Sequence, residues 1–253
     1  MGPVPHLLDN PVRAALLGPH AHFAEGHGAV LRYPTDVCPF VALPDEPDLA
    51  AWQDAAALLG PGAVLAYTVD ATPPPGWTID GFGAGVQMID VGVDPAPDPE
   101  AVRLTLADVP EMLDLVARTK PGPYLARTVT MGTYLGIRRG GALVAMAGER
   151  LHPPGWTEIS AVCTDPAYQG QGLAARLVRA VAAGIHARGE RPFLHSTATN
   201  TRAIELYTFL GFEVRRTVDF RAARIPMPLS QPAPPSQAAL VPQPSSAPPA
   251  TQS

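Results

Sequence analysis

The feature that most constrains this fold is a short stretch in the second half of the chain, residues 162–174 (VCTDPAYQGQGLA). It begins as an apolar extended run, passes through a turn at residues 169–172 that contains two glycines, and continues directly into a helical pattern. The first four N–H groups of a helix lack partners within the helix, and the helix dipole adds partial positive charge there. Glycine lets a ligand approach the backbone closely. The stretch therefore predicts a strand–turn–helix anion site suited to a pyrophosphate.

Two other phosphate-binding motifs share this arrangement, and the residues weaken both. Gly170-x-Gly172 lacks the third glycine at the dinucleotide-binding spacing, and the Lys-Ser/Thr pair of a P-loop is missing. A second glycine-rich segment, residues 81–85 (GFGAG), precedes no convincing helix. We expect a flexible turn or bulge there.

The residues around the turn alternate between strand and helix patterns. Extended runs are expected at 102–106, 134–139, 142–146, 157–164, 193–197 and 213–220, and helices after Asp108, from 173 to the stop at Gly189, and at 203–210. Asp108 and Glu111 fit a capping box. The glycine pair at 140–141 predicts a hairpin turn. This order of elements indicates a mixed α/β fold.

Composition divides the chain into four segments. Residues 1–91 read as a small α/β subdomain, with helices at 12–17 and 49–59 and strands at 29–33, 64–69 and 86–91. Residues 92–99 (GVDPAPDP) read as a linker because three prolines deny both helix continuation and ladder donors. Residues 100–225 form the main domain. In residues 226–253, nine of 28 are proline and none is charged, so we expect a disordered tail.

Composition also excludes several classes of protein. The net charge is −5 and no stretch is strongly basic, which argues against nucleic acid as a partner. No run is long enough to cross a membrane and the first residues lack a signal pattern, so we expect a cytoplasmic protein. Cys38 and Cys163 are too few for a disulfide framework. His20, His22 and His27 lack a zinc spacing, so we expect a loop there and no metal.

Two motifs together give the turn a specific resemblance. Gln169-x-x-Gly172-x-Ala174 resembles the acetyl-CoA motif of the GNAT superfamily, Gln/Arg-x-x-Gly-x-Gly/Ala. Residues 200–212 (NTRAIELYTFLGF) resemble that family's second signature, Asn-x-x-Ala-x-x-x-Tyr-x-x-x-Gly-Phe. The resemblance covers about residues 100–225 and implies a mixed, mostly antiparallel sheet flanked by helices. Some two-part members, such as the glycine N-acyltransferase type, also carry an extra N-terminal half.

The resemblance implies an N-acetyltransferase that uses acetyl-CoA as cosubstrate. The acceptor would be a primary amine of a small molecule, a peptide or a protein, and the acetyl group would pass directly in a ternary complex. A catalytically silent acyl-CoA-binding or sensing module is the alternative. The oligomeric state stays open. The cofactor-binding residues that the resemblance implies are Val162, Cys163 and Thr164 for the pantetheine arm, Gln169, Gly170, Gln171, Gly172, Leu173 and Ala174 for the pyrophosphate, and Asn200 and Ala203 across the cleft.

The resemblance also indicates candidate catalytic residues. Tyr207 occupies the position of a tyrosine that many members use as general acid toward the coenzyme A sulfur, although a packed aromatic is the alternative. Glu158 lies on the strand before the pantetheine residues, where some members hold a catalytic base, and Glu149 competes for that role. Strand alternation predicts that Glu158, Ser160 and Val162 share one face.

Two arginines and a cysteine of this region have open roles. Arg176 and Arg179 lie early on the helix after the turn. They meet the cofactor phosphates or simply occupy an exposed helix face. Cys163 is expected to be a small buried hydrophobe rather than a nucleophile.

Overall fold

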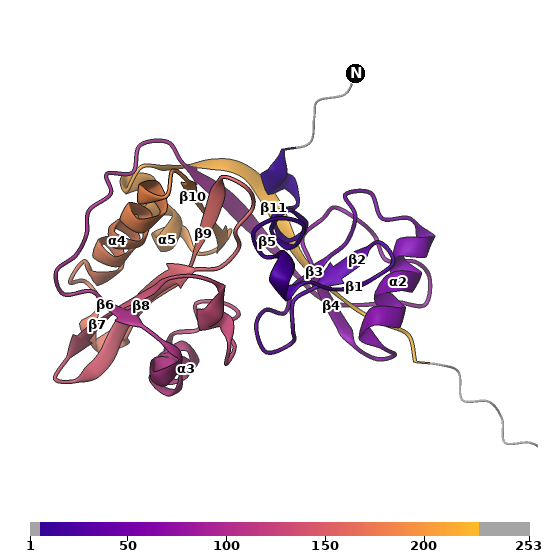
Figure 1. Cartoon of the computed structure of the whole chain (residues 1–253), viewed down its shortest axis with the longest axis horizontal. Helices are drawn as coiled ribbons and strands as arrows, with labels where there is room; N and C mark the ends of the chain where they lie inside the picture. Colours follow the sequence, from indigo (N-terminus) through magenta and orange to yellow (C-terminus); the bar gives the residue numbers. More distant parts are fainter. Residues whose placement is uncertain (1–5, 228–253) are drawn as a thin grey trace, which may run out of the picture.

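The computed structural model describes residues 6–227, and its main feature is one eight-stranded sheet (Figure 1). Neighbouring strands in this sheet are antiparallel except β9 and β10, which are parallel. This confirms the mixed, mostly antiparallel sheet. In sheet order its strands are β4 (Val64–Tyr67), β11 (Phe212–Arg224), β5 (Thr78–Asp90), β10 (Arg191–Thr197), β9 (Trp156–Thr164), β8 (Ala142–Glu149), β7 (Tyr134–Arg139) and β6 (Val102–Leu104).

Helices cover both faces of the sheet. α4 (Leu173–Ala187) and α5 (Thr201–Phe209) pack on one face, and α3 (Val109–Thr119) packs on the other around a separate buried cluster. Every strand and helix expected within residues 100–225 is present, with ends shifted by a few residues. None of the helices among residues 6–227 is both long and apolar enough to span a membrane. Short 3-10 helices lie at η1 (Leu7–Asp9), η2 (Ala21–Phe23), η3 (Leu106–Asp108), η4 (Thr128–Met131) and η5 (Pro166–Tyr168).

The local turn chemistry follows the sequence in one place and departs from it in another. Gly140 and Gly141 have φ of +57° and +87° in the β7–β8 turn, which confirms the hairpin. The predicted capping box between Asp108 and Glu111 is wrong. The Asp108 carboxylate instead accepts from the Thr105 N–H and caps η3, while Glu111 accepts from Arg138.

β5 and β11 form a long central ladder that runs from one side of the molecule to the other (Figure 1). Residues 81–85 lie within β5 rather than in a turn, and the register shift lies at one end of them, between the partners of Gly81 and Ile79. A side chain at Gly85 would collide with the Phe220 ring and the Ser196 carbonyl oxygen. Gly85 therefore permits close packing of neighbouring strands, and the segment is not a flexible turn.

The large sheet continues across the boundary expected at residues 92–99. β5 comes from the N-terminal part but pairs with β10 on one side and β11 on the other. β4 joins the same sheet through β11. The proline-rich segment expected at residues 226–253 lies outside the described residues, apart from Pro226 and Met227.

The rest of the N-terminal part packs onto this sheet. It contains α1 (Pro11–Leu16), α2 (Leu49–Leu59) and a small sheet of β1 (Glu25–His27), β2 (Val30–Arg32) and β3 (Val41–Ala42). One buried cluster joins Leu8, Leu16 and Tyr33 of this part to Leu151 and Phe193 of the second half. The N-terminal part therefore covers the beginning of β9 and β10.

Candidate active site

The parallel strands β9 and β10 separate partway along their length. Their pairing runs from Trp156 opposite Arg191 to Ile159 opposite Leu194, and the described strands form no further β9–β10 pair. A cavity of about 750 Å³ opens where they part, lined by the ends of both strands, the turn before α4, and α5. Its volume lies in the usual range for a ligand site.

A backbone irregularity in β9 lies at this separation. Ala161 has φ of +53°, which is unusual for a residue with a side chain, and the pairing with β8 shifts register beside it. Ile159 and Val162 contact the core under α4, whereas Ala161 and Cys163 pack in the core under α3. The bulge thus breaks strand alternation. The prediction that Glu158 and Val162 share a face is wrong for this reason.

Ten of the eleven predicted cofactor-binding residues line this one cavity. They are Val162, Cys163, Thr164, Gln169, Gly170, Gly172, Leu173, Ala174, Asn200 and Ala203. Gln171 is exposed and is not part of the lining. The Asn200 side chain caps α5 by accepting from the Ala203 N–H.

Two groups in the lining fit acetyl-CoA. The start of α4 has no side-chain cap, and the glycines before it, Gly170 and Gly172, have φ of +78° and +73° with open space around them. An uncapped helix start of this kind offers N–H groups to a phosphate. The Thr164 hydroxyl oxygen is buried without a hydrogen-bond partner among the described residues. A buried hydroxyl is normally paired, so this one is available to a bound ligand.

Arg176 and Arg179 do not line the cavity, and each forms an ion pair with an aspartate. Arg176 Nε lies 2.6 Å from an Asp98 oxygen and its Nη2 lies 2.5 Å from Glu100, while Arg179 pairs with Asp94. Both arginines therefore tie α4 to the segment expected to be a linker. The sequence suggested either contact with the cofactor phosphates or an exposed helix face. It did not indicate these ion pairs.

Tyr207 lies in the cavity wall with 7% of its surface exposed. Its ring packs edge-on against Phe212, with ring centres 6.2 Å apart. Its hydroxyl makes no hydrogen bond to the described residues. Burial raises the pKa of Tyr207 to about 12, so the phenol stays protonated at neutral pH. A protonated hydroxyl facing a ligand cavity can act as an acid.

Glu158 lies behind the cavity wall, fully buried. Its Oε2 accepts from Arg150 Nε at 2.8 Å, and its Oε1 accepts from Arg150 Nη2 and His195 Nδ1, each at 2.7 Å. Burial alone would raise the pKa of Glu158, but the charge and hydrogen bonds of Arg150 and the bond from His195 hold it well below its ordinary value. Such a carboxylate is a weak base, and it does not face the acceptor directly.

The competing carboxylate, Glu149, is also buried away from the cavity. Its Oε2 accepts from the Thr133 N–H at 3.0 Å, and its Oε1 accepts from Arg188, also at 3.0 Å. The described residues that line the cavity include no Asp or Glu; their ionisable side chains besides Tyr and Cys are Lys120, Arg150, His195 and Arg202. Neither predicted base therefore meets an amine in the cavity.

His195 and Arg150 were missed from sequence. His195 Nε2 lies 3.1 Å from Gln87 Nε2, and Arg215 donates to the Gln87 oxygen, which fixes the amide orientation. Gln87 therefore donates to Nε2, and the proton of the imidazole sits on Nδ1 toward Glu158. The sequence did contain a signal for Arg150. It follows the apolar run 142–148 closely, and a charged side chain that is buried with such a strand has to be paired.

The cysteines and histidines singled out from sequence have structural roles. Burial raises the pKa of Cys163 to about 11, which disfavours a thiolate nucleophile. His20 lies in the turn before η2, as expected, but is only 4% exposed, with Nδ1 2.9 Å from the Tyr33 hydroxyl and Nε2 3.1 Å from the Met131 carbonyl oxygen. Burial lowers the pKa of His20 to about 3. Residues 6–227 contain no group of three or more potential metal ligands.

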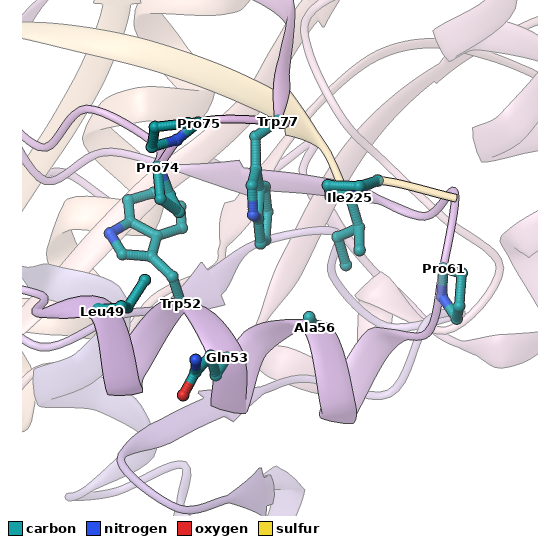
Figure 2. Close-up of a pocket in the computed structure, with 10 residues that line it drawn as sticks. Leu49, Trp52, Gln53, Ala56, Pro61, Pro74, Pro75, Trp77 and Ile225 are labelled. Atoms are coloured by element: carbon teal, nitrogen blue, oxygen red, sulfur yellow. The ribbon is translucent and has the colours of Figure 1, made fainter. Parts of the chain in front are cut away.

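A second cavity, of about 380 Å³, lies between α2 and the segment 74–77 (Figure 2). The rings of Trp52 and Trp77 pack edge-on in its wall, with centres 5.2 Å apart, beside Pro74 and Pro75. None of the described residues that line it is ionisable. It therefore lacks the groups that acyl transfer requires, and the cavity at the end of β9 is the candidate active site.

Known proteins resemble this chain at the same place. Residues 134–221 match the family model of the FR47-like protein. The N-alpha-acetyltransferase RimI of Mycobacterium tuberculosis is 41% identical over 83 residues, which are 32% of this chain and 51% of that protein. The match thus spans about half the length of this curated relative.

Solved structures extend the likeness to most of the chain. A GCN5-related N-acetyltransferase from Kribbella flavida, at 17% identity, shares the fold over 87% of this chain and 96% of its own, with a TM-score of 0.57. A Novosphingobium aromaticivorans protein assigned to the GNAT family of acetyltransferases is 41% identical, with a TM-score of 0.80. That similarity covers 87% of this chain and 98% of the other, so it includes much of the N-terminal part as well. The chain therefore belongs to the GNAT family.

Proposed function

We propose that the protein transfers the acetyl group of acetyl-CoA to a primary amine of a small molecule, a peptide or a protein. One observation carries this proposal: a single cavity joins the glycine turn before α4, the separated end of β9 and the hydroxyl of Tyr207. The names of the M. tuberculosis and N. aromaticivorans relatives, an N-alpha-acetyltransferase and an acetyltransferase, support it. Both thiols are free, which fits a reducing cytoplasm as the place of the reaction.

The cofactor end of the proposal uses backbone groups. The pyrophosphate would bind the uncapped N–H groups at the start of α4, next to Gly170 and Gly172. The pantetheine arm would run along residues 162–164, where β9 has lost its β10 partner and Thr164 has an unused hydroxyl. Asn200 and Ala203 of α5 would close the other side.

The transfer step needs the acid and base to lie on opposite sides of the thioester. The amine nitrogen forms a bond to the acetyl carbon, the carbon–sulfur bond breaks, and Tyr207 gives its proton to the departing thiolate. The second proton that the nitrogen loses, as it becomes an amide, returns to the Tyr207 phenolate. Holding both substrates in one cavity supplies proximity, so no covalent acyl-enzyme is required.

The proton that the ammonium group loses passes to His195 in this proposal. Histidine is the side chain that commonly changes protonation near neutral pH, and His195 lines the cavity. Glu158, expected from sequence to be the base itself, would be a positioning residue that holds Nδ1–H and leaves Nε2 as the acceptor atom. In this structure the Gln87 amide donates to His195 Nε2. The substrate amine therefore has to replace that hydrogen bond before Nε2 can take its proton.

Thermal unfolding with acetyl-CoA tests the cofactor, with NAD and ATP as controls. At about 100 times its dissociation constant a ligand adds about 2.7 kcal/mol to the free energy of unfolding. For a domain of this size we expect the midpoint to rise by about 5–10 °C with acetyl-CoA. Release of coenzyme A with a panel of amines then tests turnover. A shift with NAD and none with acetyl-CoA would overturn the proposal, and tight binding without release would make the protein a silent acyl-CoA-binding module.

A further inference from the structure

The candidate active site has a second polar end around Arg150, which the cofactor does not use. Arg150 is bound to Glu158, six residues before Thr164 along β9. A strand rises about 3.3 Å per residue, so Glu158 lies roughly 20 Å from Thr164, the last residue of β9 before the glycine turn. The end around Arg150 is the one at which the acceptor amine has to meet the thioester.

The guanidinium of Arg150 is held in a fixed orientation there. Its side chain is nine-tenths buried, and Nε and Nη2 donate to Glu158. The group stands over the Phe40 ring, 5.1 Å from its centre. Both Arg150 and Phe40 line the cavity. The N-terminal part of the chain therefore supplies one wall of the acceptor end.

One nitrogen of Arg150 is unused. Nη1 makes no hydrogen bond to any of the described residues, while the other two nitrogens are occupied by Glu158. Nη1 is not one of the fully buried unpaired atoms of the described residues, and Arg150 lines the cavity, so this nitrogen is accessible from it. In a residue that lines a ligand cavity, such a donor is suited to an acceptor group of the ligand.

The charges around the cavity select the kind of acceptor. Among residues 6–227, those that line the cavity include three cations, Lys120, Arg150 and Arg202, and no carboxylate. A polyamine or a lysine-rich peptide would find no counter-ion in this lining. An amine that also carries an anionic group would find a donor at Arg150.

We propose that Arg150 Nη1 binds a carboxylate of the acceptor, so that the acceptor is a small amine bearing a carboxylate, as an α-amino acid does. This rests on the acetyl transfer proposed above and names its substrate class. Arginine suits the task because its planar group offers several donors in fixed directions, and Glu158 and Phe40 remove its freedom in advance. The carboxylate takes no part in the bond changes; it orients the amine toward the thioester.

Matched acceptors test this on the wild-type chain. Coenzyme A release is measured with acetyl-CoA and several α-amino acids, with the amide of each, and with the same amines lacking the carboxylate. We expect kcat/KM to be at least about 10-fold higher for the acids, the value of one charged hydrogen bond. Equal or faster turnover of the amides overturns the inference while leaving acetyl transfer intact. Turnover of long peptides, combined with no turnover of free amino acids, also overturns the inference.

Arg150→Lys sharpens the test. The variant keeps the positive charge but loses the planar fork. We expect it to raise KM for the amino acids about 10-fold and to abolish their advantage over the amides, with the KM of acetyl-CoA unchanged. Arg103→Lys, at an exposed arginine of β6 outside the cavity, is the matched control. An unchanged acid-to-amide ratio in a folded Arg150→Lys protein overturns the inference.

A different readout applies if no amine is acetylated at all. Acetyl transfer then fails as the function, and calorimetry on the protein saturated with coenzyme A compares an amino acid with its amide. Tighter binding of the acid, lost in Arg150→Lys, supports the carboxylate site on its own. Equal binding, or none, overturns it.

Discussion

The two ends of the active-site cavity are built in different ways. At the proposed cofactor end, five of the six residues 169–174 line the cavity, next to the uncapped start of α4. At the acceptor end, Phe40, Arg150 and His195 come from distant parts of the chain and meet as side chains. The first end depends on local conformation and the second on long-range packing.

The ends also differ in how far their polar groups are satisfied. Among the described residues, the start of α4 has no side-chain cap and the Thr164 hydroxyl has no partner, so both can take up the cofactor proposed above. The Glu158 carboxylate accepts three hydrogen bonds within the protein. Changes at the cofactor end should therefore affect binding and spare the fold, whereas changes beneath the acceptor end should affect the fold itself.

Glu158→Gln should give the largest effect and acts on stability. Removing one partner of a buried ion pair leaves Arg150 without its counter-charge, which costs about 3–5 kcal/mol. The free energy of unfolding, measured with urea, should fall by that amount. Glu25→Gln, which breaks the more exposed pair with Arg32, should change it by less than about 1 kcal/mol. Equal losses of unfolding free energy in the two variants would mean that the Glu158–Arg150 pair stabilises the protein no more than an exposed ion pair does.

The pH dependence of that difference has a fixed sign. The pKa of Glu158 is lowered on folding, so the unfolded chain binds the proton more readily than the folded one. The contribution of Glu158 is therefore complete above the unfolded pKa, about 4.5, and is lost as the pH falls below it toward the folded value. The gap between wild type and Glu158→Gln should stay constant from pH 6 to 8, in the range where both states are ionised. It should narrow below about pH 4.5; a gap that widens in acid would contradict this account.

Gly172→Glu should act on binding alone. A carboxylate about 4 Å from a phosphate costs about 4 kcal/mol near a protein surface, which corresponds to an affinity for acetyl-CoA reduced about 1000-fold. The added residue also has to adopt a positive φ, so Gly140→Glu, in the open β7–β8 turn, is the control for backbone strain. Calorimetry should show normal acetyl-CoA binding in the control. Unchanged affinity in Gly172→Glu would remove the phosphate site from the start of α4.

Tyr207→Phe should act on the rate. Loss of a general acid costs about 100-fold in kcat, while the ring still packs against Phe212 and acetyl-CoA still binds. Because the pKa of Tyr207 is raised to about 12, its ionisation should not lower the wild-type rate between pH 7 and 9. Tyr67→Phe, outside the cavity, should keep its kcat. An undiminished kcat in Tyr207→Phe would assign the thiolate proton to another donor.

The same contrast explains what the sequence could predict. The strand–turn–helix at residues 162–174 and the helix that Asn200 caps are local patterns, so the sheet, the helices and the cofactor lining followed from them. The burial of Glu158 depends on residues 6–67 packing over β9, which no local pattern records. The bulge at Ala161 also interrupts the alternation of faces along β9. Counting from Val162 therefore gives the wrong face for Glu158. Packing between distant parts of the chain and one irregular backbone position are therefore what the sequence did not predict.

Thr164→Val should give the smallest effect and the sharpest contrast. Its buried hydroxyl has no partner among the described residues, so replacing it with a methyl group should leave the free energy of unfolding unchanged or slightly raised. If the hydroxyl binds the pantetheine arm, the affinity for acetyl-CoA should fall about 5-fold, the value of about 1 kcal/mol. Thr128→Val is the matched control, because the Thr128 hydroxyl donates to the Val37 carbonyl at 2.7 Å and accepts from the Leu125 N–H at 2.8 Å. That variant should lose about 1–3 kcal/mol of stability and keep its affinity. Stability lost and affinity kept in Thr164→Val would show that this hydroxyl serves the fold. The contrast between an unpaired hydroxyl at the proposed cofactor end and the fully hydrogen-bonded Glu158 carboxylate at the other end would then fail at Thr164.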